Sequence, residues 1–279
     1  MRNGYTRPFS PRGEASALFP LPWRFAADQV MIHFRADPDV LESYLPEPLV
    51  PNPDRRGEAF LWTPNLKCHP VDKKEYEKIK NPARTQYNVC VIAIPGLFKK
   101  TPVLISAFQW CDRDWLVTLS WMIGTCAKLV EFYDNGVHPM FSEVGSFQTG
   151  GLGTEFTRSL SRNGEKLISL SYKPDIEIEP EEMEFFTSTF PLLAERHIPD
   201  LNIPPVGRPL VHDLTQMILE KSSARNFLKG SASLYFNPTA DNEELGPLCP
   251  SEVLGGYTWQ TSWTMPGIKV VHDYNKSGK

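Results

Sequence analysis

One lysine in an otherwise uncharged apolar run is the strongest candidate for chemistry in this sequence. The run continues from Asp114 to Leu129 as DWLVTLSWMIGTCAKL, and Asp114 and Lys128 are its only charged residues. Burial disfavours the ammonium form of lysine, so a lysine in such a setting is a candidate nucleophile or general acid/base. The alternative is that the stem of Lys128 is buried at the end of a strand while its ammonium group reaches water.

Other residue types that carry chemistry are scattered along the chain. The six histidines and five cysteines show neither the HExxH nor the CxxC spacing of a metal site, and no GxSxG nucleophile elbow occurs. The glycine-rich run at 150–153 is followed by no helical pattern and no GK[ST] motif, so we interpret it as a turn between strands. We therefore expect neither a metal nor a cofactor.

The composition is that of a globular protein, with 41% hydrophobic and 22% charged residues. The net charge of -4 comes from 29 basic and 33 acidic residues without the clustered Lys and Arg of a nucleic-acid surface. No apolar run approaches the roughly 20 residues that a membrane span needs. The first ten residues are polar and broken by proline, unlike a signal peptide. We expect no nucleic-acid or membrane partner and a reducing, cytoplasmic location.

The elements that must position Lys128 are predicted to be mostly strands. The lysine-bearing run is predicted as a strand over 115–122, because its residues are largely apolar and β-prone. The best helix candidate is 180–197, whose acidic residues suit the positive end of the helix dipole. A shorter helix starts at Asp37-Pro38, and prolines make 1–22 an extended arm. Further strands are expected at 29–35, 59–66, 85–95, 103–109, 167–172, 210–220, 232–236 and 257–265, with a hairpin turn at Asn163-Gly164.

This succession of elements predicts one domain over residues 1–279. No linker, repeat or low-complexity tract separates two halves of the chain. The fold class is therefore α+β and predominantly β, with a barrel as one form that the sheet could take.

Several short motifs are spread along the chain in a familiar order. Residues 33–49, HFRADPDVLESYLPEPL, combine an Arg-x-Asp, a short helix and a Leu-Pro-Glu-Pro-Leu exit. They follow FPLPWRF at 19–25 and precede GTCAKL at 124–129 and VVHDY at 270–274. Together these motifs resemble the acetoacetate decarboxylase superfamily over nearly the whole chain. The resemblance implies a β-barrel or cone with a few helices on the outside.

The resemblance also implies a set of active-site positions. Decarboxylases of this superfamily carry Tyr-Pro-Lys-Lys-Leu, whose first lysine forms a Schiff base with a β-keto acid, where this chain has TCAKL. The nucleophile's position therefore falls on Ala127, and only the partner lysine, Lys128, is kept. The active-site arginine falls near Ala27 or Asp28, and a glutamate falls on Gln86. A shift of one residue would instead make Lys128 the nucleophile.

From these positions we expect a cofactor-independent lyase-type enzyme that acts on a small keto- or enol-containing metabolite by decarboxylation, dehydration or aldol chemistry. Lys128 is the expected general acid/base or Schiff-base lysine, and Gln86 the donor to a developing oxyanion. The alternative is a non-catalytic small-molecule-binding barrel that has lost the decarboxylase residues. A homo-oligomer is also expected. The expected substrate-binding residues are Asn88, Arg84, Trp62, Tyr87, Trp121 and Trp259.

Overall fold

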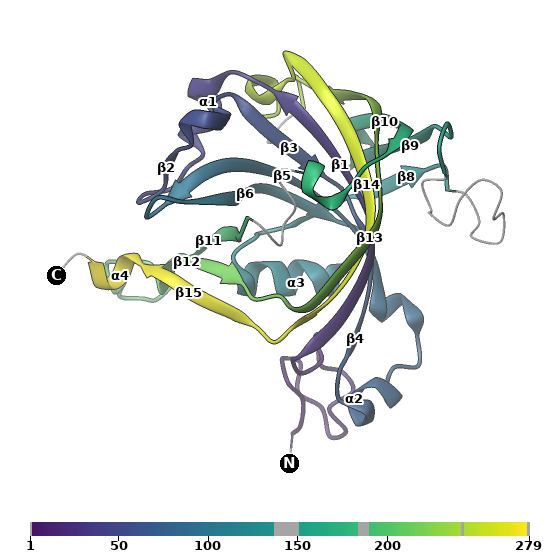
Figure 1. Ribbon diagram of the computed structural model, residues 1–279. Coiled ribbons are helices and arrows are strands. Elements are labelled where there is room, and N and C mark those ends of the chain that lie inside the picture. Colours follow the sequence, from purple (N-terminus) through teal and green to yellow (C-terminus); the bar gives the residue numbers. More distant parts are fainter. Residues whose placement is uncertain (1, 137–150, 184–189, 241–242, 278–279) are drawn as a thin grey trace.

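One strongly curved sheet organises the chain in the computed structural model, which describes residues 2–136, 151–183, 190–240 and 243–277 (Figure 1). Within these ranges the sheet has 15 strands, and its main path runs β15-β12-β11-β6-β5-β3-β1-β14-β13-β10-β9-β8. The expected α+β class with a predominance of β-sheet is confirmed. Figure 1 shows α3 within the curve of the long strands and α1, α2 and α4 at the periphery.

The strands are β1 (Trp23–Arg35), β2 (Val50–Pro51), β3 (Glu58–Trp62), β4 (Asn65–Pro70), β5 (Gln86–Phe98), β6 (Thr101–Cys111), β7 (Lys128–Leu129), β8 (Glu131–Asp134), β9 (Phe156–Arg162), β10 (Glu165–Glu177), β11 (Leu192–Ile198), β12 (Val211–Met217), β13 (Glu220–Phe236), β14 (Glu252–Met265) and β15 (Ile268–Asp273). The α-helices are α1 (Pro38–Ser43), α2 (Lys73–Glu77), α3 (Asp114–Ile123) and α4 (Tyr274–Ser277), and short 3₁₀ turns occur at Pro53–Arg55, Pro82–Thr85, Pro180–Glu182 and Gly246–Leu248.

Both faces of the central strands, such as β1 and β5, are buried, and the molecule has two apolar clusters. Alternate side chains of β1 enter each of them, because successive strand residues point to opposite faces. Val30 and Phe34 lie in the cluster that we call the first core, which also holds Trp110. Phe25 and Met31 lie in the second core, whose other members include Phe60, Tyr87, Leu116, Leu119, Ala127, Trp259 and Trp263.

The segment 128–134 joins two strands that are distant along the sheet. β7 pairs in parallel with β6, through Trp110 and Lys128, and β8 pairs with β9, through Phe132 and Leu160. The chain thereby links β6 to β9, so the sheet curls around the first core. The position of Lys128 therefore depends on the pairing of β7 with β6 and of β8 with β9.

The predicted strand at 115–122 is wrong, because these residues form α3. Leu116, Leu119 and Ser120 are its buried residues, at the spacing of one helix face. The remaining positions are also mostly apolar, so the sequence has no polar face that would reveal the helical period. Gly124 ends the helix in the left-handed conformation, with φ of +101°, and its N–H binds the carbonyl of Ser120.

The predicted helix at 180–197 is also wrong for its described residues. Its acidic start forms only a 3₁₀ turn, Pro180–Glu182, with a capping box between Glu179 and Glu182. The described residues at the other end of the predicted helix belong to β11. This strand pairs with β12 and, through Leu192 and Leu193, with β6. Local charge favoured a helix here, but the apolar residues 192–194 are held in the sheet by tertiary pairing.

Several local predictions are confirmed. Asp37 caps α1 by accepting hydrogen bonds from Asp39 N and Val40 N, with Pro38 at the first helical position. The Asn163-Gly164 turn joins β9 to β10 with positive φ at both residues. The glycine-rich run at 150–153 lies only partly within the described residues, and 151–153 form a turn.

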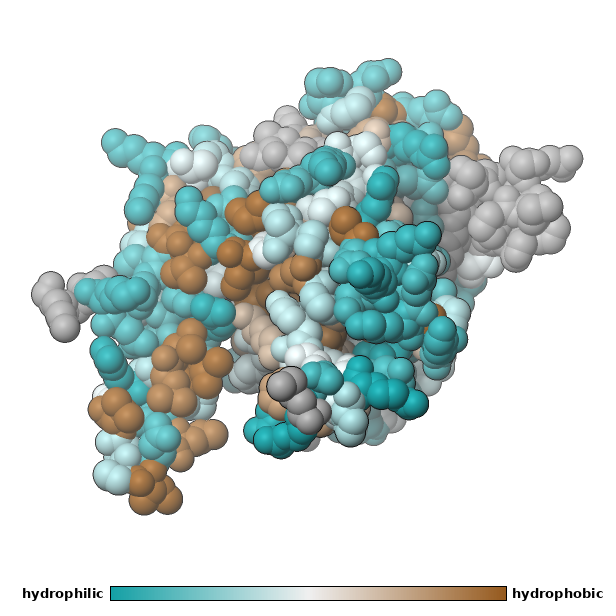
Figure 2. All heavy atoms as spheres, turned by 90° about the horizontal axis from the view of Figure 1, so that it is seen from below, coloured by the Kyte–Doolittle hydropathy of each residue, from teal (hydrophilic) through white to brown (hydrophobic). Residues whose placement is uncertain are grey.

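The connection between β11 and β12 presents a large apolar surface to solvent. Leu201, Ile203, Val206 and Leu210 are exposed, and Ile203 is 99% exposed. Figure 2, which views the molecule from below, shows apolar side chains gathered in a central region and in a projecting lobe, with hydrophilic residues around them. Contiguous exposed apolar residues are typical of contact surfaces. Homo-oligomerisation stays a prediction. Within the described ranges, no helix has the length and apolar character that crossing a bilayer requires.

We predict that Gly124→Ala lowers the free energy of unfolding by about 2–3 kcal/mol, because φ is unfavourable and the new Cβ would lie 3.1 Å from the backbone N of Arg196. Gly164→Ala is the matched control, since φ is +83° there but no atom lies within 4 Å of the new Cβ. It should cost about 1 kcal/mol. Urea denaturation of both variants measures the difference, and equal losses would contradict a role for the contact between α3 and β11.

Candidate functional site

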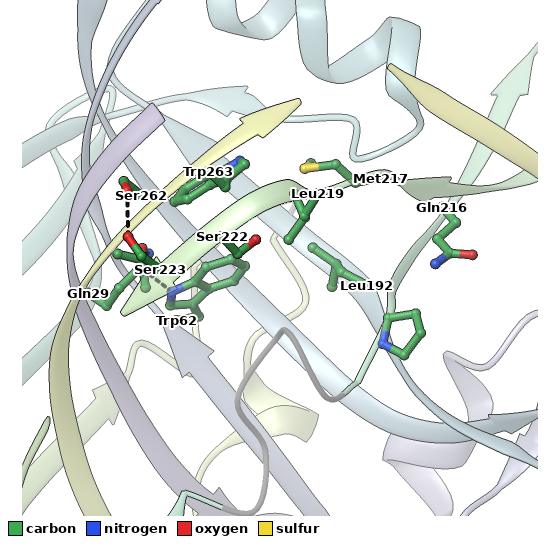
Figure 3. Close-up of a pocket in the computed structure, with 12 residues that line it drawn as sticks. Gln29, Trp62, Leu192, Gln216, Met217, Leu219, Ser222, Ser223, Ser262 and Trp263 are labelled. Atoms are coloured by element: carbon green, nitrogen blue, oxygen red, sulfur yellow. Dashed lines mark hydrogen bonds between the residues drawn. The ribbon is translucent and has the colours of Figure 1, made fainter. Parts of the chain in front are cut away.

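A cavity of about 210 Å³ lies on the second-core side of the sheet, and residues of β1, β3, β13 and β14 line it together with residues of β11 and β12 (Figure 3). Its walls combine aromatic and aliphatic side chains with amides and hydroxyls, a composition typical of small-molecule sites. No described residue that lines it is ionisable. The lining residues are Gln29, Trp62, Pro191, Leu192, Gln216, Met217, Leu219, Ser222, Ser223, Thr261, Ser262 and Trp263.

A directed chain of hydrogen bonds fixes the polar wall of this cavity. Trp62 Nε1 donates to Gln29 Oε1 at 2.6 Å, and Gln29 Nε2 donates to Thr261 Oγ1 at 2.8 Å. Because an indole N–H can only donate, it fixes which end of the Gln29 amide faces Trp62. The hydroxyl hydrogen of Thr261 is then not used by Gln29 and can be donated to a ligand. Gln29 is only 2% exposed, so its orientation is held by packing as well.

The apolar walls belong to the second core. Trp62, Leu192 and Met217 pack against this core, and Trp263 is one of its buried members. The Trp263 ring stacks on Phe25, with centroids 5.1 Å apart and planes 5° apart. The Trp263 side of the wall is therefore held by ring stacking between β14 and β1.

Lys128 and Ala127 lie on opposite sides of the sheet. Lys128 pairs with Trp110 of β6, and both side chains reach the same carboxylate, that of Glu243, on the first-core side. Ala127 is buried in the second core, which forms the cavity walls. The position that the resemblance assigns to the Schiff-base lysine thus faces the cavity side and carries a methyl group.

Glu243 is a buried carboxylate that gathers three donors. Its side chain is 2% exposed and accepts from Lys128 Nζ at 3.0 Å, Arg162 Nη1 at 2.6 Å and Trp110 Nε1 at 3.0 Å. Burial raises the pKa of this carboxyl, but the hydrogen bonds from Lys128, Arg162 and Trp110 outweigh burial and bring the pKa below its usual value. Lys128 is therefore engaged with a charged partner, in contrast to the uncharged setting that the sequence suggested.

The two predicted amides lie away from the cavity. Asn88 alternates along β5 with Tyr87, which is in the second core, so Asn88 faces the other side. Its backbone N–H and its Nδ2 donate to the Asp112 carboxylate at 2.9 and 3.0 Å, and its Oδ1 accepts from the buried Arg158 at 3.2 Å. Gln86 begins the same strand and is exposed. The structure brings neither amide to the cavity.

The remaining predicted residues divide between the cavity, the second core and the surface. Trp62 lines the cavity, while Tyr87 and Trp259 are buried in the second core. Trp121 is 47% exposed on α3. Arg84 donates to the carbonyl of Ser16 at 2.8 Å and lies over the ring of Phe19, so it holds the N-terminal arm.

Sequence reasoning missed Gln29, Thr261 and Trp263, which form much of the cavity wall, and it missed Glu243. A signal did exist for Gln29, which stands at an inward position of the β1 alternation between Ala27 and Met31. Glu243 had none, because it lies in an irregular loop far from Lys128 in sequence.

We predict that Glu243→Gln lowers the free energy of unfolding by roughly 2–3 kcal/mol, because it leaves two partly buried cations without their carboxylate. Glu244→Gln is the matched control on the adjacent, exposed residue, and its effect should stay within about 0.5 kcal/mol. Chemical denaturation at neutral pH measures both variants.

We predict that the destabilisation caused by Glu243→Gln, relative to the wild-type protein, depends on pH. Since the folded-state pKa of Glu243 is lowered, its stabilising contribution is complete above the ordinary carboxyl value of 4.5 and is lost as pH falls through the folded pKa. The stability difference between wild type and Glu243→Gln should therefore shrink in acid. A difference that stays constant from pH 7 to the acid limit of folding would contradict the ionised carboxylate.

Comparison with known proteins identifies a family that the sequence matches. The sequence matches the acetoacetate decarboxylase (ADC) family over residues 6–275. No curated protein matches it significantly.

Solved structures of similar fold cover nearly the whole chain. The enduracididine biosynthesis enzyme MppR, complexed with the condensation product of pyruvate and imidazole 4-carboxaldehyde, is 24% identical with a TM-score of 0.81, and the match covers 98% of each chain. An acetoacetate decarboxylase-like enzyme from Sphingomonas wittichii RW1 is 21% identical with a TM-score of 0.83, over 97% of this chain and 100% of that one. Acetoacetate decarboxylase from Legionella pneumophila is 17% identical with a TM-score of 0.74, over 98% and 96%. The family match over residues 6–275, together with this shared fold, shows that the chain belongs to the acetoacetate decarboxylase family.

Proposed function

We propose that this protein is a cofactor-independent lyase-type enzyme that binds a small keto- or enol-containing compound in the cavity beside Gln29 and Trp62. The observation that carries the proposal is the chain of donors from Trp62 through Gln29 to Thr261, which leaves a hydroxyl hydrogen for a ligand oxygen. Membership of the family supports it. MppR, which shares the fold, is described in complex with pyruvate and with a condensation product of pyruvate.

The donor chain suits the chemistry of enols. Decarboxylation, dehydration and aldol reactions of carbonyl compounds all pass through an enol or enolate, whose oxygen gains negative charge. Thr261 Oγ1–H and the second hydrogen of Gln29 Nε2 could both donate to that oxygen. Because Trp62 orients the amide before the ligand arrives, little reorganisation would be needed during the reaction.

In this proposal Lys128 is a positioning residue. Its ion pair with Glu243 holds β7 against β6, with Ala127 on the cavity side. An ammonium group that donates to a buried carboxylate would have to leave that ion pair before it could attack a substrate. The chemistry would then proceed without an imine between protein and substrate.

The second candidate function is a non-catalytic small-molecule-binding protein. It is favoured by one observation, that none of the described residues lining the cavity is ionisable. General acid–base catalysis needs a group whose pKa lies near the working pH, and amides, indoles and alcohols do not provide one. Turnover of a bound keto compound distinguishes the two candidates.

We predict that borohydride treatment in the presence of a β-keto acid leaves the protein mass unchanged, because Lys128 is paired and Ala127 has no amine. Intact-mass spectrometry measures the outcome. The variant Ala127→Lys is the informative comparison, since it restores an amine on the cavity side. An adduct on the wild-type protein that disappears in Lys128→Met would instead establish Lys128 as a nucleophile and overturn the positioning role.

We predict that Thr261→Val lowers kcat for a keto substrate by about 100-fold, the usual effect of removing one oxyanion donor. Valine keeps the shape of threonine, so the folded structure should persist. Thr264→Val is the matched control, because Thr264 lies on the same strand but outside the cavity. Steady-state kinetics of both variants measure the effect. Equal activity of the two variants would contradict a role for the Thr261 hydroxyl.

A further inference from the structure

We infer that the cavity selects an uncharged keto or enol compound, with a ring or other apolar body, and excludes carboxylates. This inference rests on the proposed function and names the substrate class of the same site. It narrows the proposed reactions to dehydration and aldol chemistry, because decarboxylation requires a carboxylate on the substrate. It differs from what the resemblance would imply, since the decarboxylases act on a keto acid. The argument depends on the charges around the cavity, the donors inside it and the shape of its walls.

The described lining of the cavity supplies no cation. Its polar members are amides and hydroxyls, namely Gln29, Gln216, Ser222, Ser223, Thr261 and Ser262, and two indole N–H groups. Near the positions that the resemblance assigns to a lysine and an arginine, the second core contains Ala127 and Ala27. Both alanines are buried, at 2% and 7% exposure, and neither side chain can supply a positive charge on this side of the sheet.

Two cations near the cavity, Lys128 and Arg196, are paired with carboxylates of their own, and Arg225 of β13 donates to the amide oxygen of Gln260. Lys128 lies 3.0 Å from Glu243, across the sheet from the cavity. Arg196 of β11 forms two hydrogen bonds with the Asp213 carboxylate, at 3.0 and 2.6 Å, and a third with the carbonyl of Met122. Such pairs leave little positive potential for an anion in the cavity. A carboxylate bound there would lose its hydration without gaining a counter-charge, which disfavours binding strongly.

A neutral carbonyl compound meets complementary groups instead. Thr261 can donate to the carbonyl or enol oxygen, and Gln29 fixes Thr261 through the 2.8 Å hydrogen bond. Trp62 and Trp263 present indole surfaces on which an apolar ring can pack. Leu192, Met217 and Leu219 close the opposite wall, as Figure 3 shows. The site therefore combines oriented hydrogen-bond donors at Thr261 and Gln29 with aromatic and aliphatic walls.

A matched ligand pair tests this inference: 4-oxo-4-phenylbutanoate and its methyl ester. Isothermal titration calorimetry at pH 7.5 should show the ester bound about 100-fold more tightly, because the acid must bury an unpaired charge. Affinity for the acid should rise as the pH falls toward its carboxyl pKa, since the neutral form binds, while affinity for the ester should stay constant. Equal or tighter binding of the acid at pH 7.5, or no binding of either compound, would overturn the inference.

A variant that introduces a positive charge tests the electrostatic argument from the protein side. Met217→Lys places an ammonium group on the cavity wall and should reverse the preference toward the acid, while Met217→Leu should keep the preference for the ester. Thermal unfolding of both variants verifies that they fold. A Met217→Lys protein that folds and still prefers the ester would contradict the electrostatic argument.

These binding measurements do not depend on turnover. If the ester binds tightly but no keto or enol compound is converted, the proposed lyase function fails and the substrate class stands. If the acid is both bound preferentially and converted, the lyase function stands and the substrate class fails.

Discussion

The buried carboxylate of Glu243 is the interaction on which the rest of the structure depends. It pairs with Lys128, at the start of the segment 128–134, and with Arg162, at the end of β9. This segment links β6 to β9. The indole N–H of Trp110, on β6, donates a third hydrogen bond to this carboxylate. A loop residue thus joins three parts of one curved sheet, and the inward direction of Ala127 follows from that attachment. The charge cluster therefore lies on the first-core side of the sheet, and the cavity lies on the second-core side.

Much of the strand framework could be predicted from alternation and turn chemistry. The Asn163-Gly164 hairpin, the Asp37 cap and the long strand β5 all have local sequence signals that agree with the fold. α3 could not be predicted this way, because a helix that is apolar on nearly all sides has no readable period. The helix predicted at 180–197 was wrong for a different reason. Its acidic residues favoured a helix, but pairing with β6 and β12 holds β11 extended.

The candidate site was harder to predict than the fold. The sequence directed attention to Lys128 correctly as an unusual residue, but its partner Glu243 lies 115 residues away in the chain. The polarity of the cavity depends on pairing between β1 and β14, which are separated by more than two hundred residues, so Gln29 and Thr261 could not be connected in advance. The family resemblance directed attention to positions 127 and 128, and only the sheet geometry showed that Ala127 packs in the second core while Lys128 pairs with Glu243 on the other side.

The opposite orientations of Ala127 and Lys128 have a consequence for how this site can change. Ala127 directly precedes β7 and packs in the second core, while Lys128 begins β7 and pairs with Glu243, so a substitution at one alters the packing of this core and a substitution at the other alters the ion pair. The second-core position and the ion-paired position are thereby uncoupled although they are neighbours in the sequence. A side chain at position 127 can therefore change while the sheet keeps its anchor at Lys128, so this junction is a place where the chain can vary without loss of the fold.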